Sequence, residues 1–542
     1  MDLLLVNGVI ATQDEKDSFV EALAIKDDKI AKVGTTAEIL DLKKEGTEII
    51  DLGGKLVLPG FNDSHMHLLN YGNFLKNIDL TGTTSLDEII QKVKSILDKN
   101  SLKKDQWIKG RGWNDDYFQG DNRFPNRYDL DKISTEYPII LTRACGHIAI
   151  TNSKALELAY ITKDTKQPVG GEFDIDENGE PLGIFRENAI ELINNAIPEP
   201  SVEELKDMLL VAIKKANAYG ITSVQTDDFG VISYANYEKI ITAYEELKEE
   251  GKLSLRVYEQ CLVQDSSRLE GFLDKGYNTG YGDEFFKIGP LKLVADGSLG
   301  ARTAALTSPY KDAPHTYGIP VFSQEGIDHL VDIAHSRGMQ IAIHAIGDKA
   351  MYMAFESIEK ALNNSPKNDH RHGIVHCQIT DRYLLNKFKE LDMTAYIQPI
   401  FLDYDWQIAE SRVGPELIKT SYNWKTLVDG KVNIACGSDC PVEDLNVLKG
   451  IYEAVTRKDL KGKPDGGWMP EQRLTVQEAV HGYTVGGAYT SFEEDIKGTI
   501  EEGKLADIVV LSRNIYEIPE DEIKDAKVKM TILDGQIVYR DE

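Results

Sequence analysis

Short apolar runs alternate with stretches of helical periodicity over the second half of the chain. From residue 216 onward, each strand-like run is followed by a segment whose apolar residues recur at helical spacing, as in a parallel barrel. The predicted strands are 222–226, 254–258, 291–294, 340–344, 373–376, 394–397 and 432–436, and a segment ending at His65 makes the eighth. We therefore predict an α/β fold built on a (β/α)8 TIM-type barrel.

The two ends of the chain share a different pattern, in which short strands are separated by turns. Apolar segments 3–10, 22–25 and 29–34 near the start are matched by 506–511 and 528–538 near the end. Neither set is large enough to form a sheet domain alone. We expect residues 1–57 and 491–542 to form one small β-sandwich domain, with the rest of the chain inserted in it.

A long segment separates the first barrel strand, expected within 58–71, from the remainder of the barrel at 216–490. Residues 72–215 combine helical stretches with polar loops rich in Gly, Pro and Asn, and we interpret them as an inserted α/β subdomain near the active site. Its residues Trp113, Tyr117 and His147 are candidates for substrate contacts. A core role is equally consistent with any one of them.

The acidic balance of the chain excludes some classes of partner. The 61 Lys and Arg residues stand against 89 Asp and Glu, a formal net charge of -28, so we expect neither a nucleic acid nor an anionic membrane as a partner. No apolar run approaches the ~20 residues of a spanning helix, and the first residues follow a strand pattern rather than that of a signal peptide. We expect a cytoplasmic protein with a large core.

The cysteines of the chain are odd in number and scattered. They are Cys145, Cys261, Cys377, Cys436 and Cys440. Without a CxxC pair, this set argues against both a disulfide framework and a thiolate zinc cluster, and reduced thiols are the expectation.

Ionisable side chains stand where the predicted barrel strands end. His65 and His67 are two residues apart on an extended segment, so their side chains point to the same side and can hold one metal ion together. The other such residues are Lys292 in the fourth strand, His344 and His376 ending the fifth and sixth, and Asp439 after the eighth. A single histidine at a strand end is more often structural, but four histidines with a carboxylate around one barrel mouth favour a metal site.

Five motifs in this order resemble the amidohydrolase superfamily. They are 59–67 (PGFNDSHMH), 292–306 (KLVADGSLGARTAAL), 343–348 (IHAIGD), 376–378 (HCQ) and 437–442 (GSDCPV), and 146–156 (GHIAITNSKAL) looks like a further motif of the insert. The chain is similar in particular to amidohydrolase family 3, the YtcJ-like group that includes N-substituted formamide deformylase. The resemblance covers nearly the whole chain.

The resemblance implies a metal-dependent hydrolase with a binuclear centre. The implied ligands are His65, His67, Lys292, His344, His376 and Asp439. One divalent ion is expected at the first two histidines with Asp439, and a second at the other two histidines. Zinc suits a histidine-rich site, although carboxylate ligands also admit manganese or iron.

Lys292 is expected to carry a carbamate formed from CO2, which bridges the two ions. A carbamate offers two anionic oxygens, whereas an ammonium only donates hydrogen bonds and repels a cation. The alternative is an unmodified Lys292 paired with Asp296. Asp296 and Arg302 are otherwise expected behind the ligands or on the substrate side, and the sequence does not decide between these roles.

The implied reaction is hydrolysis of an amide or related non-peptide C–N bond, such as that of an N-acyl or N-formyl amine. Hydroxide generated at the ions attacks, and Asp439 moves its proton to the leaving nitrogen. Ester or lactone opening, cyclic-amide hydrolysis and deamination use the same parts and stay open. A catalytically silent regulatory or structural member of the fold is the alternative of another class, and the complete ligand set argues against it. The expected partners are a small-molecule substrate and, as one option, a second copy in a homodimer.

Overall fold

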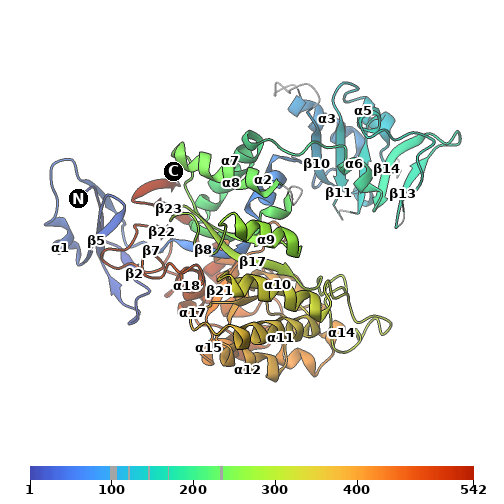
Figure 1. Cartoon of the computed structure of the whole chain (residues 1–542). Helices are drawn as coiled ribbons and strands as arrows, with labels where there is room; N and C mark the ends of the chain where they lie inside the picture. The colour runs from blue at the N-terminus through green and yellow to red at the C-terminus, as the bar shows by residue number, and fades with distance from the viewer. Residues whose placement is uncertain (98–105, 120–122, 145–146, 169, 232–235, 542) are drawn as a thin grey trace. The chain divides into compact units, whose positions relative to one another are not determined.

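The computed structural model describes residues 1–97, 106–119, 123–144, 147–168, 170–231 and 236–541. The chain divides into two compact units, one formed by Met1–Gly72 with Val202–Glu542 and the other by Asn73–Ser201. The first unit holds an eight-stranded sheet and the two sheets that the chain ends build, and the second holds a six-stranded sheet of its own (Figure 1).

The eight-stranded sheet is the predicted TIM-type barrel. Its strands are β8 (Phe61–Met66), β15 (Ile221–Thr226), β16 (Arg256–Leu262), β17 (Phe286–Val294), β18 (Ile341–Ala345), β19 (Gly373–His376), β20 (Thr394–Ile397) and β21 (Ile434–Cys436). Neighbouring strands pair in parallel, from β8 with β15 through to β20 with β21. Beyond the last strand, Asp439 N donates to His65 O at 2.8 Å and His67 N to Cys440 O at 2.8 Å, which joins β21 to β8. Gly437 permits this approach, because a Cβ there would lie 2.5 Å from His65 N.

Amphipathic helices follow the barrel strands and cover them from outside. Examples are α8 (Tyr237–Glu249), α9 (Ser266–Asp274), α10 (Gln324–Ser336), α11 (Asp348–Asn364) and α12 (Arg382–Glu390) (Figure 1). In α11 the buried residues Met351, Phe355 and Ile358 recur at helical spacing and belong to the main hydrophobic core. Side chains cap several of these helices at their first turn; Ser323, for example, accepts from Gly326 N at the start of α10.

Two barrel strands differ in extent from the predicted segments. The strand predicted at 254–258 begins at Arg256 and continues to Leu262, and the strand predicted at 291–294 begins earlier, at Phe286. The first half of β17 is hidden by Pro290, whose missing N–H makes the middle of a sheet strand look like a loop in the sequence. The ladder accommodates it with a register irregularity between Glu259 and Cys261 of the neighbouring strand.

The chain ends meet in a six-stranded sheet of the first unit. Its order is β24 (Gln536–Arg540), β23 (Val528–Leu533), β22 (Ile508–Leu511), β7 (Leu56–Pro59), β2 (Val9–Ala11) and β3 (Phe19–Val20). A four-stranded sheet consists of β5 (Lys29–Gly34), β4 (Ala22–Lys26), β1 (Leu3–Val6) and β6 (Glu48–Asp51). The two sheets share one apolar core, in which Leu5 and Ile25 of the smaller sheet are clustered with Ile508 and Ile532 of the larger.

The second unit is a mixed sheet with helices. Its strands are β9 (Ile78–Asp79), β10 (Ile108–Trp113), β11 (Ile139–Arg143), β12 (Ile148–Thr151), β14 (Pro181–Glu187) and β13 (Gly171–Ile175), and its helices are α3 (Leu86–Leu97), α4 (Arg127–Asp131), α5 (Ser153–Leu158) and α6 (Ile190–Asn194). The expected insert 72–215 reaches further, over α7 (Val202–Ala218). That helix belongs with the first unit, because its Leu205 and Leu209 are part of the barrel's core.

The cysteines in the described part of the chain, Cys261, Cys377, Cys436 and Cys440, are free thiols and buried, whereas Cys145 lies outside the described residues. Burial raises the pKa of the Cys377 thiol well above its usual value. No helix in the described ranges combines the length and the apolar character needed to cross a membrane.

Candidate metal centre

The carboxyl ends of the barrel strands bring together the six residues expected as ligands. His65 and His67 end β8, Lys292 lies in β17, His344 in β18 and His376 at the end of β19, and Asp439 follows β21. Because the strands are parallel, all of these positions fall at one mouth of the barrel.

The first cluster is formed by the His-x-His segment and Asp439. Asp439 Oδ1 lies 3.0 Å from His67 Nε2 and 3.4 Å from His65 Nε2, and the ring centroids of the two histidines are 5.3 Å apart. Ligand atoms of His65, His376 and Asp439 all lie within 4.8 Å of one another, and all three residues are buried. Two imidazole nitrogens and a carboxylate at these separations fit a divalent transition metal.

Lys292 is directed at the same cluster. Its Nζ lies 3.3 Å from His65 Nε2 and 3.8 Å from Asp227 Oδ2, and the side chain is buried. The carboxylate beside Lys292 is therefore that of Asp227, not that of Asp296. Burial lowers the pKa of the Lys292 ammonium, because the charged form is desolvated.

His344 and His376 stand side by side on the neighbouring strands β18 and β19. Their ring centroids are 4.4 Å apart, and that of His376 is 5.5 Å from that of His65, so the second pair adjoins the first cluster. His344 Nε2 lies 3.3 Å from Gly297 O and 3.4 Å from Asp296 Oδ1. These contacts orient the His344 ring at the edge of the centre.

Three of the histidines are oriented by a partner of their Nδ1 atom. His65 Nδ1 lies 2.7 Å from Gln260 Oε1, His67 Nδ1 lies 3.0 Å from Asp227 O, and His376 Nδ1 lies 2.8 Å from Gln398 Oε1. Each oxygen accepts, so Nδ1 carries the proton. Nε2 of His65 and of His376 then keeps its lone pair for a metal, whereas Nε2 of His67 faces Asp439 and is available to a metal when it loses its proton. Such partners behind the ligands are characteristic of metal-bound histidines, and the donor set therefore fits divalent ions.

The charges of the cluster depend on burial and on Asp439. Burial and the nearby Lys292 lower the pKa of His65 to about 3, so that imidazole is neutral. Burial alone would lower the pKa of His67 as well, but the hydrogen bond to Asp439 and its charge raise it to about 9. Burial raises the pKa of Asp439, but its close contacts with the His65 and His67 rings outweigh this and hold the pKa well below its usual value. Without an ion, His67 and Asp439 therefore form an ion pair.

The backbone is strained at two of the ligands. His376 has a φ of 83° and Asp439 a φ of 58°, in the left-handed region that residues other than glycine rarely adopt. The residue after His376, Cys377, also has a positive φ, of 49°. Strain of this kind is retained where the surrounding structure fixes a side chain for function.

Comparison with known proteins agrees with this geometry. The sequence profile of the amidohydrolase family matches residues 48–539. The chain belongs to the amidohydrolase family. It is 34% identical to YtcJ of Bacillus subtilis strain 168 over 98% of both chains, and 33% identical to the protein LONG AFTER FAR-RED 3 of Arabidopsis thaliana over 99% of this chain and 91% of that one.

Two further proteins are similar to this amidohydrolase over nearly its whole length. N-substituted formamide deformylase of Arthrobacter pascens is 25% identical over 99% of this chain and 98% of its own. The crystal structure of a metal-dependent hydrolase from Pyrococcus furiosus superposes with a TM-score of 0.79 and 31% identity, over 95% of this chain and 100% of that one. The protein is thus a hydrolase that depends on a divalent metal.

Asp296 and Arg302 lie on the loop after β17 of the amidohydrolase barrel. The buried Asp296 carboxylate accepts from Ala305 N at 2.8 Å, Ile346 N at 3.0 Å and Gly347 N at 2.8 Å, so it fixes two loops beside His344. Arg302 forms a salt bridge with Asp312 at 2.7 Å. Asp296 therefore supports the site indirectly, by fixing the loops beside His344.

The insert residues proposed as substrate contacts have separate surroundings in the second unit. Trp113 is fully buried in the core of that unit, where its Nε1 donates to Leu141 O at 3.0 Å. Tyr117 is 62% exposed. The exposed His147 pairs with Glu187 at 2.9 Å. Trp113 thus packs as a core residue, while Tyr117 and His147 present their side chains to solvent.

Sequence reasoning missed four buried residues that support the ligands. Gln260 and Gln398 fix His65 and His376, and Asp227 flanks Lys292. Asp63 accepts from Ser438 N at 3.0 Å and from Ser438 Oγ, which holds the Asp439 loop, and burial raises its pKa to about 7. Asp227 follows a barrel strand directly, so the strand-end rule that selected the ligands could also have selected it.

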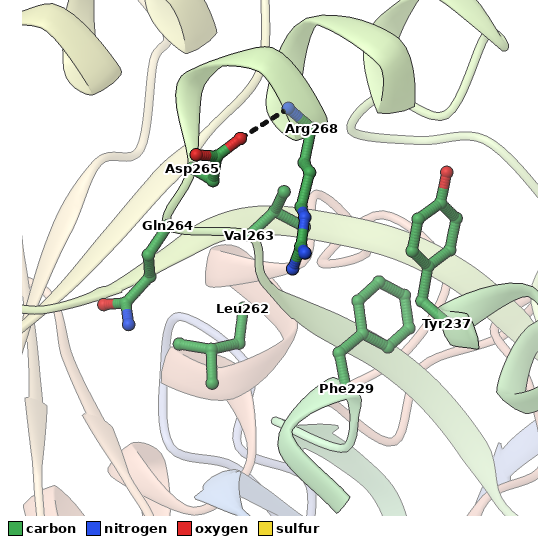
Figure 2. Close-up of a pocket in the computed structure, with 7 residues that line it drawn as sticks. All are labelled: Phe229, Tyr237, Leu262, Val263, Gln264, Asp265 and Arg268. Atoms are coloured by element: carbon green, nitrogen blue, oxygen red, sulfur yellow. Dashed lines mark hydrogen bonds between the residues drawn. The ribbon is translucent and has the colours of Figure 1, made fainter. Parts of the chain in front are cut away.

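A cavity of about 220 Å³ lies near the carboxyl end of β16. Its walls include Phe229, Tyr237 and Leu262, and Arg268 places a guanidinium beside them (Figure 2). Leu262 follows Gln260 by two residues, so both side chains leave the strand on the same side, and Leu262 pairs in register with Lys292. The cavity therefore lies two residues along β16 from Gln260, whose side chain contacts the expected ligand His65.

Proposed function

We propose that this amidohydrolase cleaves an amide or related non-peptide C–N bond of a small molecule, with N-acyl and N-formyl amines as the first candidates. The observation that carries the proposal is the cluster of ligand-type side chains in which Gln260 and Gln398 leave His65 Nε2 and His376 Nε2 unprotonated. The name of the relative N-substituted formamide deformylase supports the choice of bond.

We assign His65, His67 and Asp439 to one divalent ion and His344 and His376 to a second, with zinc as the expected metal. When bound, ions of this type acidify a water molecule and polarise a substrate carbonyl. Asp439 is the group that receives the water proton and delivers it to the leaving nitrogen, because its carboxylate is ionised and borders both His65 and His67.

Lys292 is proposed to carry the CO2-derived carbamate. Its burial favours the neutral amine, which is the form that adds CO2. The amine nitrogen forms a bond to the carbon of CO2, one C=O π pair moves to oxygen, and one proton leaves the nitrogen. The resulting anion attracts divalent ions, which an ammonium at the same place would repel.

The cavity beside β16 is proposed to receive the apolar substituent of the amide. Phe229 and Tyr237 stack with ring centroids 5.5 Å apart and form one wall, and Figure 2 shows the Arg268 side chain between these rings and Gln264. An apolar wall beside a guanidinium suits an aryl or alkyl group that carries an acidic substituent.

The test is metal analysis combined with a substrate panel. The protein reconstituted with Zn²⁺ is expected to hold two ions per chain, because six ligands are too many for one tetrahedral ion with an open position. It is then assayed for amine release from N-formyl and N-acyl amines, beside matched esters, lactones and cyclic amides, with chelator-treated protein as the control.

Each outcome of the panel bears on the proposal. Zinc-dependent release of amines supports it. Hydrolysis of the esters alone would show that the bond is wrongly assigned. Zinc-loaded protein without turnover of any compound would instead favour the catalytically silent member of the fold.

A further inference from the structure

Asp227 is a buried carboxylate that lacks a complete set of partners. It follows β15 directly and is 4% exposed. Its Oδ2 lies 3.8 Å from Lys292 Nζ, beyond hydrogen-bond distance, and its Oδ1 has no hydrogen-bond partner within the described part of the chain. Buried carboxylate oxygens are nearly always paired, so an unpaired one beside a cluster of ligand-type side chains points to a partner that the chain itself does not supply.

The backbone of Asp227 is fixed against the His-x-His strand. Asp227 N donates to Met66 O at 2.9 Å, and Asp227 O accepts from His67 Nδ1 at 3.0 Å. Lys292, His67, Asp439 and His344 of the proposed centre act on its carboxyl group, and Glu259 and Cys261 of β16 also interact with it electrostatically. The side chain is therefore held among the ligands from two sides.

The neighbouring Asp228 is a structural carboxylate and provides a comparison, because both of its oxygens have hydrogen-bond donors. Its Oδ1 accepts from Leu69 N at 2.8 Å and from Thr226 Oγ1 at 2.9 Å, and its Oδ2 accepts from Tyr244 OH. Both oxygens of Asp228 are thus used by the fold, whereas Asp227 leaves one oxygen available.

We propose that Asp227 is a further carboxylate ligand of the metal centre, in addition to the six residues assigned above. The ligand it takes is a divalent cation, to which the carboxyl group offers Oδ1. The inference rests on the proposed function only in that the mouth of the barrel binds metal, and it holds for any bond that the enzyme cleaves. It also means that the centre contains a carboxyl group next to Lys292 before any CO2 is added.

The first experiment measures zinc affinity without substrate. Full-length wild type, Asp227→Asn and Glu259→Gln are equilibrated with Zn²⁺ buffered by a competing chelator, and bound metal is quantified. We expect Asp227→Asn to weaken binding of at least one ion on the order of 100-fold. Glu259→Gln is the matched control, because Glu259 is a buried neighbouring carboxyl whose Oε2 also has no partner among the described residues. Its Oε1 accepts from Asp228 N, and the charges that act on it are those of Asp228 and Asp227 rather than of the histidines, so the zinc affinity of this variant should stay within about twofold of wild type.

Cobalt gives a second readout. In the Co²⁺-substituted protein, loss of a ligand changes the coordination number, so the visible absorption of Asp227→Asn should shift while that of Glu259→Gln does not. If Asp227→Asn is poorly folded, Asp227→Ser provides the same loss of charge with a smaller side chain. A folded Asp227 variant with wild-type zinc affinity and cobalt spectrum would overturn the proposal.

A double variant separates a ligand from a counter-ion of Lys292. In a Lys292→Ala background, in which a short carboxylic acid in solution partly restores zinc binding, a counter-ion has no ammonium left to neutralise. Asp227→Asn would then change zinc affinity no further, and that result overturns the proposal. If Asp227 is a ligand, Asp227→Asn should still lower zinc affinity at least tenfold in this background. A wild-type chain that binds no zinc would overturn the metal centre as a whole, whereas zinc binding without amide turnover would leave this ligand standing.

Discussion

Both ends of the barrel bury charged side chains, but these side chains differ in whether the protein supplies them with partners. At the amino ends of the strands, Lys497 Nζ contacts Glu493 at 2.6 Å and Ser223 Oγ at 3.0 Å, and Glu493 also contacts Lys287 at 2.7 Å. Arg256 similarly binds Asp507 through two nitrogens, at 2.7 and 3.1 Å. These charges are paired within the fold.

At the carboxyl ends the pairing is incomplete. Lys292 Nζ has an imidazole nitrogen at 3.3 Å and a carboxylate oxygen at 3.8 Å, and one oxygen of Asp227 has no partner within the described residues. The difference shows which end is structural and which is built for a ligand. Buried ions that the chain pairs hold sheets together, whereas buried ions left short of partners mark a site that something else completes.

The largest effect that would test this contrast is expected for Lys292→Ala. The variant should lose bound metal and activity, because the proposed bridging anion would be gone. A short carboxylic acid in solution should restore part of both by filling the space. Lys497→Ala is the control from the opposite end, and it should lower the melting temperature while the folded protein keeps its metal. Retention of both ions by folded Lys292→Ala would remove the bridge.

Asp439→Asn should reduce kcat by about 10²- to 10⁴-fold, the typical contribution of a general acid–base group. Part of the metal should remain, since His65 and His67 are unchanged. Steady-state kinetics on the best substrate of the panel measures the effect. Near-normal turnover would show that another group moves the proton.

Two buried glutamines, one at each end of the barrel, allow the same comparison with a smaller expected effect on metal affinity. Gln260→Leu removes the acceptor of His65 Nδ1 and should weaken metal affinity about 10- to 100-fold. Gln340 lies at the other end, where its Nε2 donates to Thr490 O at 3.0 Å, and Gln340→Leu should lower stability only. Equal zinc affinity of Gln260→Leu and wild type in a chelator competition would contradict the role of Gln260.

The change expected from Glu493 concerns stability rather than metal binding, and it depends on pH. Burial raises the pKa of Glu493, but Lys497 and Lys287 outweigh it and lower the pKa to about 2, from an ordinary 4.5. The folded state therefore binds fewer protons than the unfolded state between these values. Its contribution, about 3 kcal/mol at 1.4 kcal/mol per pKa unit, is present above pH 4.5 and is lost as the pH falls towards 2.

Denaturant unfolding of metal-free protein tests this dependence. Glu493→Gln should be less stable than wild type at pH 7, and the difference should shrink between pH 5 and pH 3. Metal-free samples prevent the acid release of ions from contributing. The exposed Lys463–Asp465 pair is the control, because Asp465→Asn should leave the unfolding midpoint unchanged at every pH. A difference for Glu493→Gln that does not vary with pH would contradict the linkage.

The sequence predicts the barrel because each of its strands is an apolar run followed by an amphipathic helix. Pro290 hides the first half of β17, since a proline inside a sheet strand is rare. Histidines and Asp439 at strand ends are chemically conspicuous, so the strand-end rule gathers them at one mouth, as the structure does. Nothing in the sequence marks Gln260 or Gln398 in the same way, because glutamine has many structural uses and only the three-dimensional contact assigns it to a histidine.

The insert is less predictable, because its tertiary packing decides which residues are exposed. Trp113 follows a glycine-rich stretch that suggests a loop, yet it ends β10 and packs in the core of the second unit. The residue at which the insert ends is equally hard to predict from the sequence. The apolar face of α7 has the same periodicity whether it packs on the insert or on the barrel, and only the contacts of Leu205 and Leu209 distinguish the two.

The sheet that joins the chain ends imposes an order on synthesis. β7 leads through Gly60 into β8, which carries the first ligands, and β7 pairs with β22, whose residues 508–511 are made about 440 residues later than His67. Pairing over so long a loop is slow and cannot begin before β22 leaves the ribosome. The histidines translated first are thus among the last to be locked in place, and the nascent chain acquires its full metal affinity only near the end of synthesis.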